Sequence, residues 1–326
     1  MFLSIINSCK DIFYLSLRLI MIKLMAKNAN SFKIYLQIIL ANVFWGFSFV
    51  WTDIALKENI GPITLVLLRL IFATLLLGIL AKFSGNLQKL QFKHLKYFLG
   101  LALCEPFLYF LCETYGLTMV SPTVTSVIIA TIPLFTPIVG FFILKEHINS
   151  STIIGIVVSM IGVLGVVFSG DKDFSGQIIG AVLVFGAVLT ALGYAVFVKY
   201  LIHRYNATTL VFYQNFIGLI FFIPCFFVID FSHLGEMHFT FKAISSIVQL
   251  AVFASVLAFI FYSRSVKVLG VTKVGVFCYT IPVLTALFAF FMVDERLSII
   301  QWFGMSIVIF GLIISQMVFK KSKTNA

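Results

Sequence analysis

Thr131-Ile132-Pro133 returns in the second half of the chain as Thr280-Ile281-Pro282, 149 residues later. The same shift aligns three further pairs of residues: Glu146 with Glu295, Gly155 with Gly304, and Gly162 with Gly311. A single gapless offset that keeps all these positions in register indicates an internal repeat. The sequence therefore predicts two homologous halves.

The composition is that of a membrane protein. Hydrophobic residues make up 61% of the 326 residues, charged residues make up only 11%, and the mean hydropathy is +1.11. A soluble globular domain carries about 25% charged residues, and a water-soluble chain of this length could not bury so much apolar surface. We therefore predict an all-α membrane protein that crosses the bilayer several times.

Ten apolar segments are long enough to cross a bilayer, whose hydrocarbon core takes about 20 residues of helix. They lie near residues 34–54, 63–82, 95–115, 119–143, 151–169, 177–198, 209–229, 243–263, 274–293 and 299–319. Each half supplies five segments, and because five is odd, the second half must enter the membrane inverted relative to the first. Inverted repeats are the usual architecture of secondary transporters, whose two halves can exchange inward-open and outward-open shapes.

The same pattern divides the chain into four parts. We expect a cytoplasmic N-terminal segment at 1–33, a first five-helix repeat at 34–169, a second at 177–319 and a basic cytoplasmic tail at 320–326. Residues 12–22 are apolar, but Arg18 interrupts them and they are too short to span a bilayer. They form either an interfacial helix or sequence upstream of a true start at Met21 or Met25, and the polar start at Met25 favours the second interpretation.

Lys and Arg residues are distributed unevenly between the two sides of the predicted spans. With the N-terminus placed inside, eighteen lie on the inner side, four lie on the outer side, and Arg69 alone lies within a span. Loops rich in Lys and Arg remain in the cytoplasm, so we predict a multi-pass protein of the inner (cytoplasmic) membrane with both termini in the cytoplasm. The net charge of +11 follows from this topology and requires no nucleic-acid partner.

Short motifs at particular positions in the predicted spans resemble those of a known protein family. The first span contains Trp45-Gly46, and the second runs from Pro62 to Arg69. The fourth and ninth end in Pro133…Lys145-Glu146 and Pro282…Asp294-Glu295, and a helix punctuated by glycine follows each. With ten spans in a five-plus-five repeat, these sequences resemble the EamA-type branch of the drug/metabolite transporter superfamily. The resemblance covers residues 34–319.

The resemblance implies transport of small molecules. Members of this branch export or import amino acids, amines, nucleosides, S-adenosylmethionine and other metabolites, mostly without ATP. In agreement, no G-x-x-x-x-G-K-[ST] phosphate loop occurs in the sequence. The resemblance also implies a central cavity lined by the first, third, fourth, sixth, eighth and ninth spans, and it makes Arg69 part of the framework of the fold.

Ionisable residues inside the spans are candidates for function, because a charge in the hydrocarbon costs about 2.5–3.5 kcal/mol. Arg69 and Glu105 lie at mid-depth and within reach of each other, so a structural ion pair is one interpretation. Glu105 is the sharper candidate: it could bind a cationic group, take up a proton, or serve a backbone group freed by Pro106. Asp53 and Glu113, at the outer ends of their spans, are expected to be solvated.

Two repeat-related pairs are candidates for moving parts. Glu146 and Glu295 each lie beside a basic residue, and we expect them to lock a helix corner or a gate. Pro133 and Pro282 lie mid-span, where a proline removes a backbone hydrogen bond and kinks the helix. Since freed carbonyls inside a membrane must face protein or a wet cavity, both kinks are predicted to border the pathway, with simple bending as the alternative.

Aromatic and amide side chains complete the predicted cavity. Aromatic faces can hold amines or planar ligands, although ordinary helix packing is the alternative for each residue. The candidates for substrate binding or coupling are Trp45, Arg69, Glu105, Tyr109, Tyr194, Gln214 and Tyr279. A single intramembrane arginine favours a zwitterionic, cationic or apolar substrate over a polyanion. The five scattered cysteines predict neither a metal site nor a disulfide framework, and no cofactor is expected.

These features together predict a secondary-active or facilitative transporter, and export is the favoured direction. The substrates would be small organic metabolites such as amino acids or amines, carried by alternating access through the central cavity. A non-transporting membrane receptor or assembly protein is the alternative. An intramembrane enzyme is a weaker one, since the sequence contains neither HExxH nor GxSxG and its five histidines fall at span ends or in loops. Protons are candidate coupling ions, and a homodimer is a candidate assembly.

Overall fold

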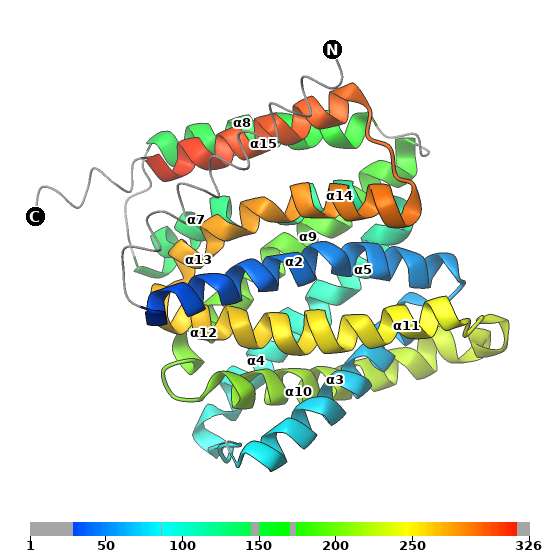
Figure 1. Ribbon diagram of the computed structural model, residues 1–326, viewed down its shortest axis with the longest axis vertical. Helices are drawn as coiled ribbons and strands as arrows, with labels where there is room; N and C mark the ends of the chain where they lie inside the picture. The colour runs from blue at the N-terminus through cyan, green and yellow to red at the C-terminus, as the bar shows by residue number, and fades with distance from the viewer. Residues whose placement is uncertain (1–28, 86, 145–149, 170–173, 318–326) are drawn as a thin grey trace, which may run out of the picture.

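The computed structural model describes residues 29–85, 87–144, 150–169 and 174–317. These ranges contain helices and no strand, which confirms the all-α prediction for the described part of the chain. The helices lie side by side, with axes that run in broadly the same direction (Figure 1). The N-terminal segment 1–28, Glu146 and the tail from 318 lie outside the described residues, so the expectations placed on them stay predictions.

The first half is built from five helical units, two of which are divided into shorter segments. These are α2 (Ala29–Lys57); α3 (Pro62–Ser84); η1 (Phe92–His94), α4 (Leu95–Ala102), the π-helical η2 (Leu103–Leu108) and α5 (Tyr109–Met119); α6 (Pro122–Ile129) and α7 (Ile132–Leu144); and α8 (Ser150–Phe168).

The second half repeats this plan. Its units are α9 (Phe174–Leu201); α10 (Ala207–Cys225), η3 (Phe226–Asp230) and η4 (Phe231–Glu236); α11 (Phe241–Gln249), η5 (Leu250–Ala258) and α12 (Phe259–Leu269); α13 (Val271–Phe277), η6 (Cys278–Thr280) and α14 (Ile281–Val293); and α15 (Ile299–Met317).

In the described ranges, nine helical stretches are long and apolar enough to cross a membrane, and Ile299–Ser315 is a shorter apolar helix. The nine are Phe32–Lys57, Pro62–Phe83, Phe92–Met119, Pro122–Val139, Ser150–Phe168, Ser175–Leu201, Ala207–Glu236, Phe241–Leu269 and Val271–Val293. The protein is therefore a multi-pass membrane protein.

Capping residues fix where several of these helices begin. The side chain of Ser121 accepts a hydrogen bond from the Val124 amide, and Pro122 follows as the first residue of α6. Asn206 caps α10 and Thr240 caps α11 in the same way. A side-chain oxygen at this position satisfies an amide that has no partner within the helix, so the chain turns at these points.

The two prolines expected to kink continuous helices instead stand near the start of new ones. Pro133 is the second residue of α7 and Pro282 is the second residue of α14. A proline is well tolerated in the first helical turn, because the amide it lacks would have no partner within the helix. The fourth and ninth spans are thus divided into two helices each, at positions related by the repeat.

The α8 and α15 helices pack against each other through glycines at one edge of the bundle (Figure 1). A Cβ atom on Gly155 would lie 2.6 Å from the carbonyl oxygen of Gly311, and one on Gly162 would lie 2.6 Å from that of Gly304. Between these contacts, the hydroxyl of Ser159 donates to the carbonyl of Val308 at 3.1 Å. The small residues let the two backbones approach closely, as in other membrane helix pairs.

Gly162→Ala is expected to lower the thermal unfolding midpoint of the detergent-purified protein, because its new methyl group would collide with a backbone oxygen. Overpacking of this kind typically costs about 1–3 kcal/mol. Gly165→Ala is the matched control on the same helix, since its Cβ would lie 3.9 Å from the nearest atom, Gly304 Cα. Equal midpoints for the two variants would contradict the close approach.

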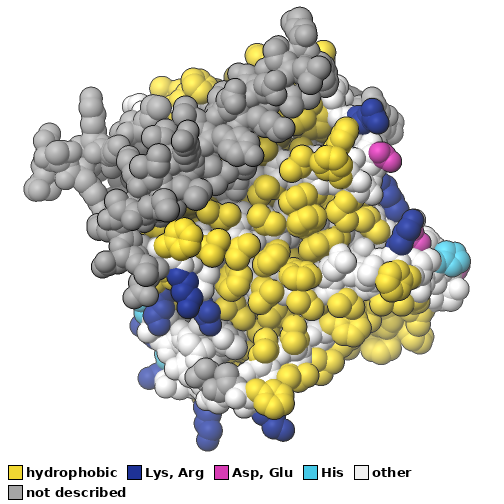
Figure 2. Space-filling model, in the orientation of Figure 1, with side chains coloured by type: hydrophobic (Ala, Val, Ile, Leu, Met, Phe, Trp, Pro, Cys, Tyr) yellow, Lys and Arg dark blue, Asp and Glu magenta, His cyan; other side chains and the backbone are white. Residues whose placement is uncertain are grey.

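The outer surface carries an apolar belt between two charged rims. Figure 2 shows hydrophobic side chains across the middle of one face, with Lys and Arg gathered at one end and Lys, Arg, acidic and His side chains at the other. Large apolar side chains are exposed around the molecule, among them Phe291, Phe303 and Val182. Such a belt suits the hydrocarbon core of a bilayer, and the helix axes in Figure 1 run from one rim to the other.

Candidate substrate cavity

A cavity of about 730 Å³ lies between the two halves of the molecule. Its inner walls include the buried side chains of Arg69, Glu105 and Glu113, and its mouth is bordered by exposed residues at the end of α9, among them Lys199 and Arg204. The cavity therefore reaches the surface at the end of the molecule where α9 ends. Its volume is within the range of pockets that hold small organic ligands.

Arg69 is held on the cavity wall by two contacts. Its Nε donates to the hydroxyl of Ser255 at 2.6 Å, and its guanidinium carbon lies 4.1 Å from the centre of the Phe110 ring. Glu113 is its strongest electrostatic partner, and Glu105 also interacts with it. Among the described residues, neither carboxylate approaches Arg69 within the 4.0 Å of a salt bridge. Arg69 and the two carboxylates thus share the depth of the cavity, and neither carboxylate forms a salt bridge with Arg69.

Glu105 is positioned by a break in the third span. Its backbone is extended, with φ of −151° and ψ of 119°, between helical residues on both sides. The side chain is only 7% exposed and lines the cavity. The sequence signal for this break is Pro106, because the residue before a proline is biased away from helical geometry. A carboxylate at such a break can meet a ligand while the neighbouring backbone remains helical.

Four aromatic side chains form a closed cycle on another part of the wall, and we refer to Trp45, Tyr194, Phe259 and Tyr262 as the aromatic cluster. The ring centres of Trp45 lie 5.5 Å from Phe259 and 5.3 Å from Tyr262, and those of Tyr194 lie 6.1 Å and 6.5 Å from the same two rings. All four residues line the cavity. The Tyr194 hydroxyl donates to Gln214 Oε1 at 3.3 Å.

The cavity gathers most, but not all, of the residues proposed from the sequence. Those that line it are Trp45, Arg69, Glu105, Tyr109, Tyr194 and Pro133. Gln214 and Tyr279 are buried but do not line it, and Gln214 adjoins it only through Tyr194. Pro282 is also absent from the wall, although its neighbour Ile281 lines it.

Glu113 and Asp53, expected to be solvated at the outer ends of their spans, are both buried, although Asp53 also lines a cavity that reaches the surface. Both side chains belong to residues that are 5% exposed, because α5 continues to Met119 and α2 continues to Lys57, beyond the predicted span ends. Phe259 and Tyr262 were missed altogether. Tyr262, a polar aromatic residue in the eighth span, could have been selected by the criterion that selected Tyr194, whereas nothing distinguishes Phe259 from the other 37 phenylalanines.

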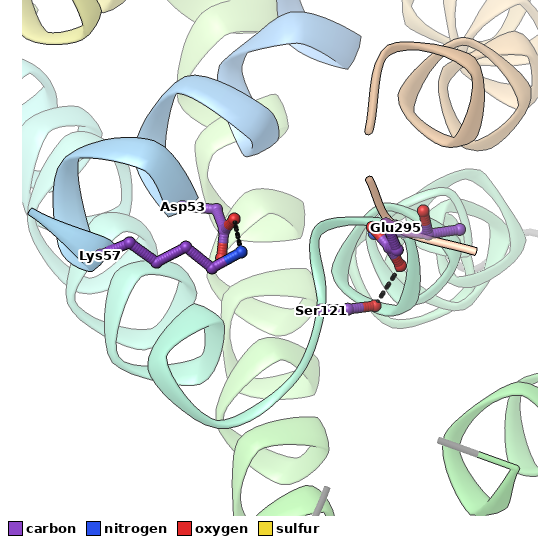
Figure 3. Close-up of polar contacts among 5 residues, drawn as sticks. Asp53, Lys57, Ser121 and Glu295 are labelled. Atoms are coloured by element: carbon purple, nitrogen blue, oxygen red, sulfur yellow. Dashed lines mark hydrogen bonds and ion pairs between the residues drawn. The ribbon is translucent and has the colours of Figure 1, made fainter. Parts of the chain in front are cut away.

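At the opposite end of the molecule from the cavity mouth, Glu295 joins the two halves. Its carboxylate accepts a hydrogen bond from the Ser121 hydroxyl at 2.5 Å (Figure 3). It also accepts one from the Thr123 amide at 3.4 Å, at the beginning of α6. The neighbouring Arg296 lies over the Phe290 ring at 5.6 Å. Burial raises the pKa of the Glu295 carboxyl, and these hydrogen bonds act in the opposite direction.

A second cavity, of about 460 Å³, lies at this end and reaches the surface beside Lys57 and Glu236. Asp53 lines it and forms an ion pair of 2.6 Å with Lys57 (Figure 3). On α2, the wall of the main cavity ends at Phe49 and that of the second begins at Asp53. Along α2, the last residue of one wall and the first of the other are thus four residues apart, which is a helical rise of about 6 Å.

The described residues contain no group of three or more His, Cys, Asp or Glu side chains suited to a metal ion. The depth of the main cavity presents one arginine, two carboxylates, several phenol groups and aromatic surface, and its mouth adds the basic side chains of Lys199, His203 and Arg204. This arrangement can bind an organic ion or zwitterion.

Comparison with known proteins agrees with this architecture. The EamA-like transporter family matches the chain twice, at residues 32–168 and 178–317. An uncharacterized transporter of Archaeoglobus fulgidus is 28% identical over 287 residues, which cover 86% of this chain and 96% of that protein. The uncharacterized transporter YetK of Bacillus subtilis is 28% identical over 229 residues, covering 68% of this chain and 67% of YetK.

One solved crystal structure has the same fold, with a TM-score of 0.66 at 14% sequence identity, and the match covers 89% of this chain and 98% of the other. The family match extends over both halves of the chain and includes the helices that line the cavity. The chain is therefore a member of the EamA-like transporter family.

Proposed function

We propose that this protein carries small organic metabolites such as amino acids or amines across the cytoplasmic membrane by alternating access, and that it works chiefly as an exporter. The main cavity is the observation that carries this proposal. It is open at one end, closed at the other, and lined at its depth by buried charges that an uncharged channel or a packing interface would not need.

The contact between α8 and α15 supports an inverted arrangement of two five-helix repeats. Gly155 meets Gly311 and Gly162 meets Gly304, although the repeat pairs Gly155 with Gly304 and Gly162 with Gly311. Ser159 contacts Val308, its own repeat equivalent. Reciprocal contacts of this kind are those of a two-fold axis. Since the two helices are antiparallel and lie across the membrane, the axis would lie in the membrane plane, as in other transporters with inverted repeats.

The distribution of basic residues supports a cytoplasmic location for the cavity mouth. Lys199, Arg204, Lys267 and Lys273 belong to the end of the molecule where α9 and α12 end and α13 begins. By the positive-inside tendency, this end faces the cytoplasm and the cavity is open inward. A substrate can then enter from the cell, and export would require the Glu295 end to open. Proton coupling through Glu105 and a homodimer stay predictions.

Comparative metabolomics of cells and medium tests this function. Overexpression is expected to raise one amine or amino acid in the medium, and deletion is expected to raise it inside the cells. Glu105→Gln is expected to reduce export at least about tenfold. A decrease of this size corresponds to the free energy of one buried hydrogen bond to a charged group. Glu236→Gln, which makes the same change on an exposed side chain, is the matched control and should transport normally.

Other outcomes would change the proposal in defined ways. A metabolite that accumulates inside the cells when the protein is overexpressed would reverse the direction to uptake. No change in any metabolite, together with no flux of the same compounds into liposomes that contain the purified protein, would contradict transport. Full export by Glu105→Gln would remove that carboxylate from the mechanism.

A further inference from the structure

The aromatic cluster and Glu105 together have the composition of a site for an organic cation. A cation within about 6 Å of an aromatic ring centre is attracted by the ring, and several rings acting together recognise methylated ammonium groups. Each ring of the cluster has two others of the cluster within 6.5 Å, so a cation seated against this wall meets several rings at once.

A carboxylate that can act as a counter-ion lines the same cavity. The Glu105 carboxylate interacts electrostatically with the hydroxyl groups of both Tyr194 and Tyr262, and it lines the same cavity. Arg69 is also on the cavity wall, but Ser255 and Phe110 hold its guanidinium. The cavity therefore contains both the aromatic cluster and an anionic group.

The hydrogen-bonding capacity of the cluster distinguishes between kinds of ammonium group. A primary ammonium has three N–H donors, and leaving a buried donor without an acceptor is costly. The rings of Trp45 and Phe259 offer no acceptor, so the N–H donors of a primary ammonium that point toward these two rings would stay unpaired. A quaternary ammonium has no N–H donors, and its methyl groups bury apolar surface against the rings.

We propose that the aromatic cluster binds a quaternary or N-methylated ammonium group of the transported molecule, with Glu105 as its counter-ion. The inference rests on the proposed function, because it takes the cavity to be the substrate site. Binding can nevertheless be measured without any transport, so the two can fail separately.

The test compares three small molecules on the purified full-length protein in detergent. Choline carries a quaternary nitrogen, 3,3-dimethyl-1-butanol has the same shape with carbon in its place, and ethanolamine carries a primary ammonium. Choline is expected to bind at least about tenfold more tightly than either of the other two, which is the range of a desolvated cation–π site. Displacement of radiolabelled choline gives all three affinities.

Variants connect the binding to the cluster. Trp45→Leu and Tyr262→Leu are each expected to weaken choline binding about tenfold, whereas Tyr262→Phe keeps the ring and should bind normally. Glu105→Gln should weaken choline binding while leaving 3,3-dimethyl-1-butanol unaffected. Phe291→Leu, which removes a ring that is 74% exposed on the outer surface, is the matched control. Size-exclusion profiles and unfolding midpoints show that each variant is folded.

Three results would overturn the inference: choline binding no tighter than 3,3-dimethyl-1-butanol, ethanolamine binding as tightly as choline, or wild-type affinity in both leucine variants. Flux of a primary amine without choline binding would overturn it and leave the transport function standing. Choline binding that depends on the cluster, without flux of any compound, would uphold the inference and contradict transport.

Discussion

Arg69→Met is expected to destabilise the protein severely and to abolish transport. The variant leaves Glu105 and Glu113 buried on the cavity wall without the cation that interacts with both, and it removes the partner of Ser255. Removing one member of a buried charged group typically costs about 3–5 kcal/mol, because the remaining charge stays in a poor environment. The thermal unfolding midpoint in detergent and flux into liposomes measure the two effects.

A double variant distinguishes the contribution of the Arg69 charge from the contribution of its packing contacts. Arg69→Met combined with Glu113→Gln is expected to recover most of the lost stability, since one carboxylate is neutralised, while transport remains absent. Lys267→Met removes a positive charge from an exposed position of α12 and should change neither quantity. If Glu113→Gln restored no stability, the importance of Arg69 would lie in its contacts with Ser255 and Phe110.

Raising the external pH is expected to open the end of the cavity that Glu295 closes, and Glu295→Gln is expected to remove this dependence. Burial raises the pKa of the Glu295 carboxyl above its ordinary value of 4.5, and the negative charge of Asp53 on α2 adds to the effect. In an outward-open state the carboxyl would return to water. The closed state therefore binds the proton on Glu295 more tightly than the outward-open state does. This proton stabilises the closed state relative to the open one, fully below pH 4.5, and the stabilisation is lost as the pH rises through the raised pKa of the closed state.

A cysteine reporter on the cavity wall measures this opening. Ser48 lines the main cavity and is 5% exposed, so Ser48→Cys, in a chain without its native cysteines, is reached from outside only when this end opens. Its reaction with an external cationic methanethiosulfonate should accelerate severalfold as the external pH rises above 4.5 and through the raised pKa of Glu295. Lys242→Cys, exposed on α11, corrects for ionisation of the thiol itself.

Two replacements at position 295 give opposite expectations. Glu295→Gln resembles the protonated acid and should react slowly at every pH, whereas Glu295→Ala loses the hydrogen bonds to Ser121 and Thr123 and should react rapidly at every pH. Lys57 pairs with Asp53 nearby, so Lys57→Met is included to show whether that ion pair contributes. The same pH dependence in Glu295→Gln as in the wild type would contradict the role of this carboxyl.

The sequence was sufficient to predict the membrane class and the helical character, because long apolar segments are a strong signal. It was less reliable at the ends of helices. The first span was expected to end at 54, but α2 reaches Lys57, since the ion pair with Asp53 lets charged residues continue the helix. A hydropathy profile identifies apolar segments and contains no information about such ion pairs. The division of the fourth span near Pro133 was anticipated only as a kink.

The candidate site was predicted where one residue is chemically conspicuous in its helix. Arg69 and Glu105 are charges in apolar surroundings, and both line the cavity. Phe259 and Tyr262 were missed because their importance comes from meeting Trp45 and Tyr194, on helices far apart in the chain. The face that a helix turns toward its neighbours depends on packing between the two halves, which the pattern of a single helix does not contain.

The thin partition between the two cavities has an electrical consequence. Both cavities reach the surface, from opposite ends, and only one turn of α2 lies between Phe49 and Asp53. A transmembrane voltage falls mainly across whatever is not filled by electrolyte, so most of it would be concentrated over about 6 Å. A carried positive charge would meet nearly the whole potential, about 2.3 kcal/mol per 100 mV, in this one step. The rate of crossing the partition, and not of entering the cavity, would therefore follow the membrane potential.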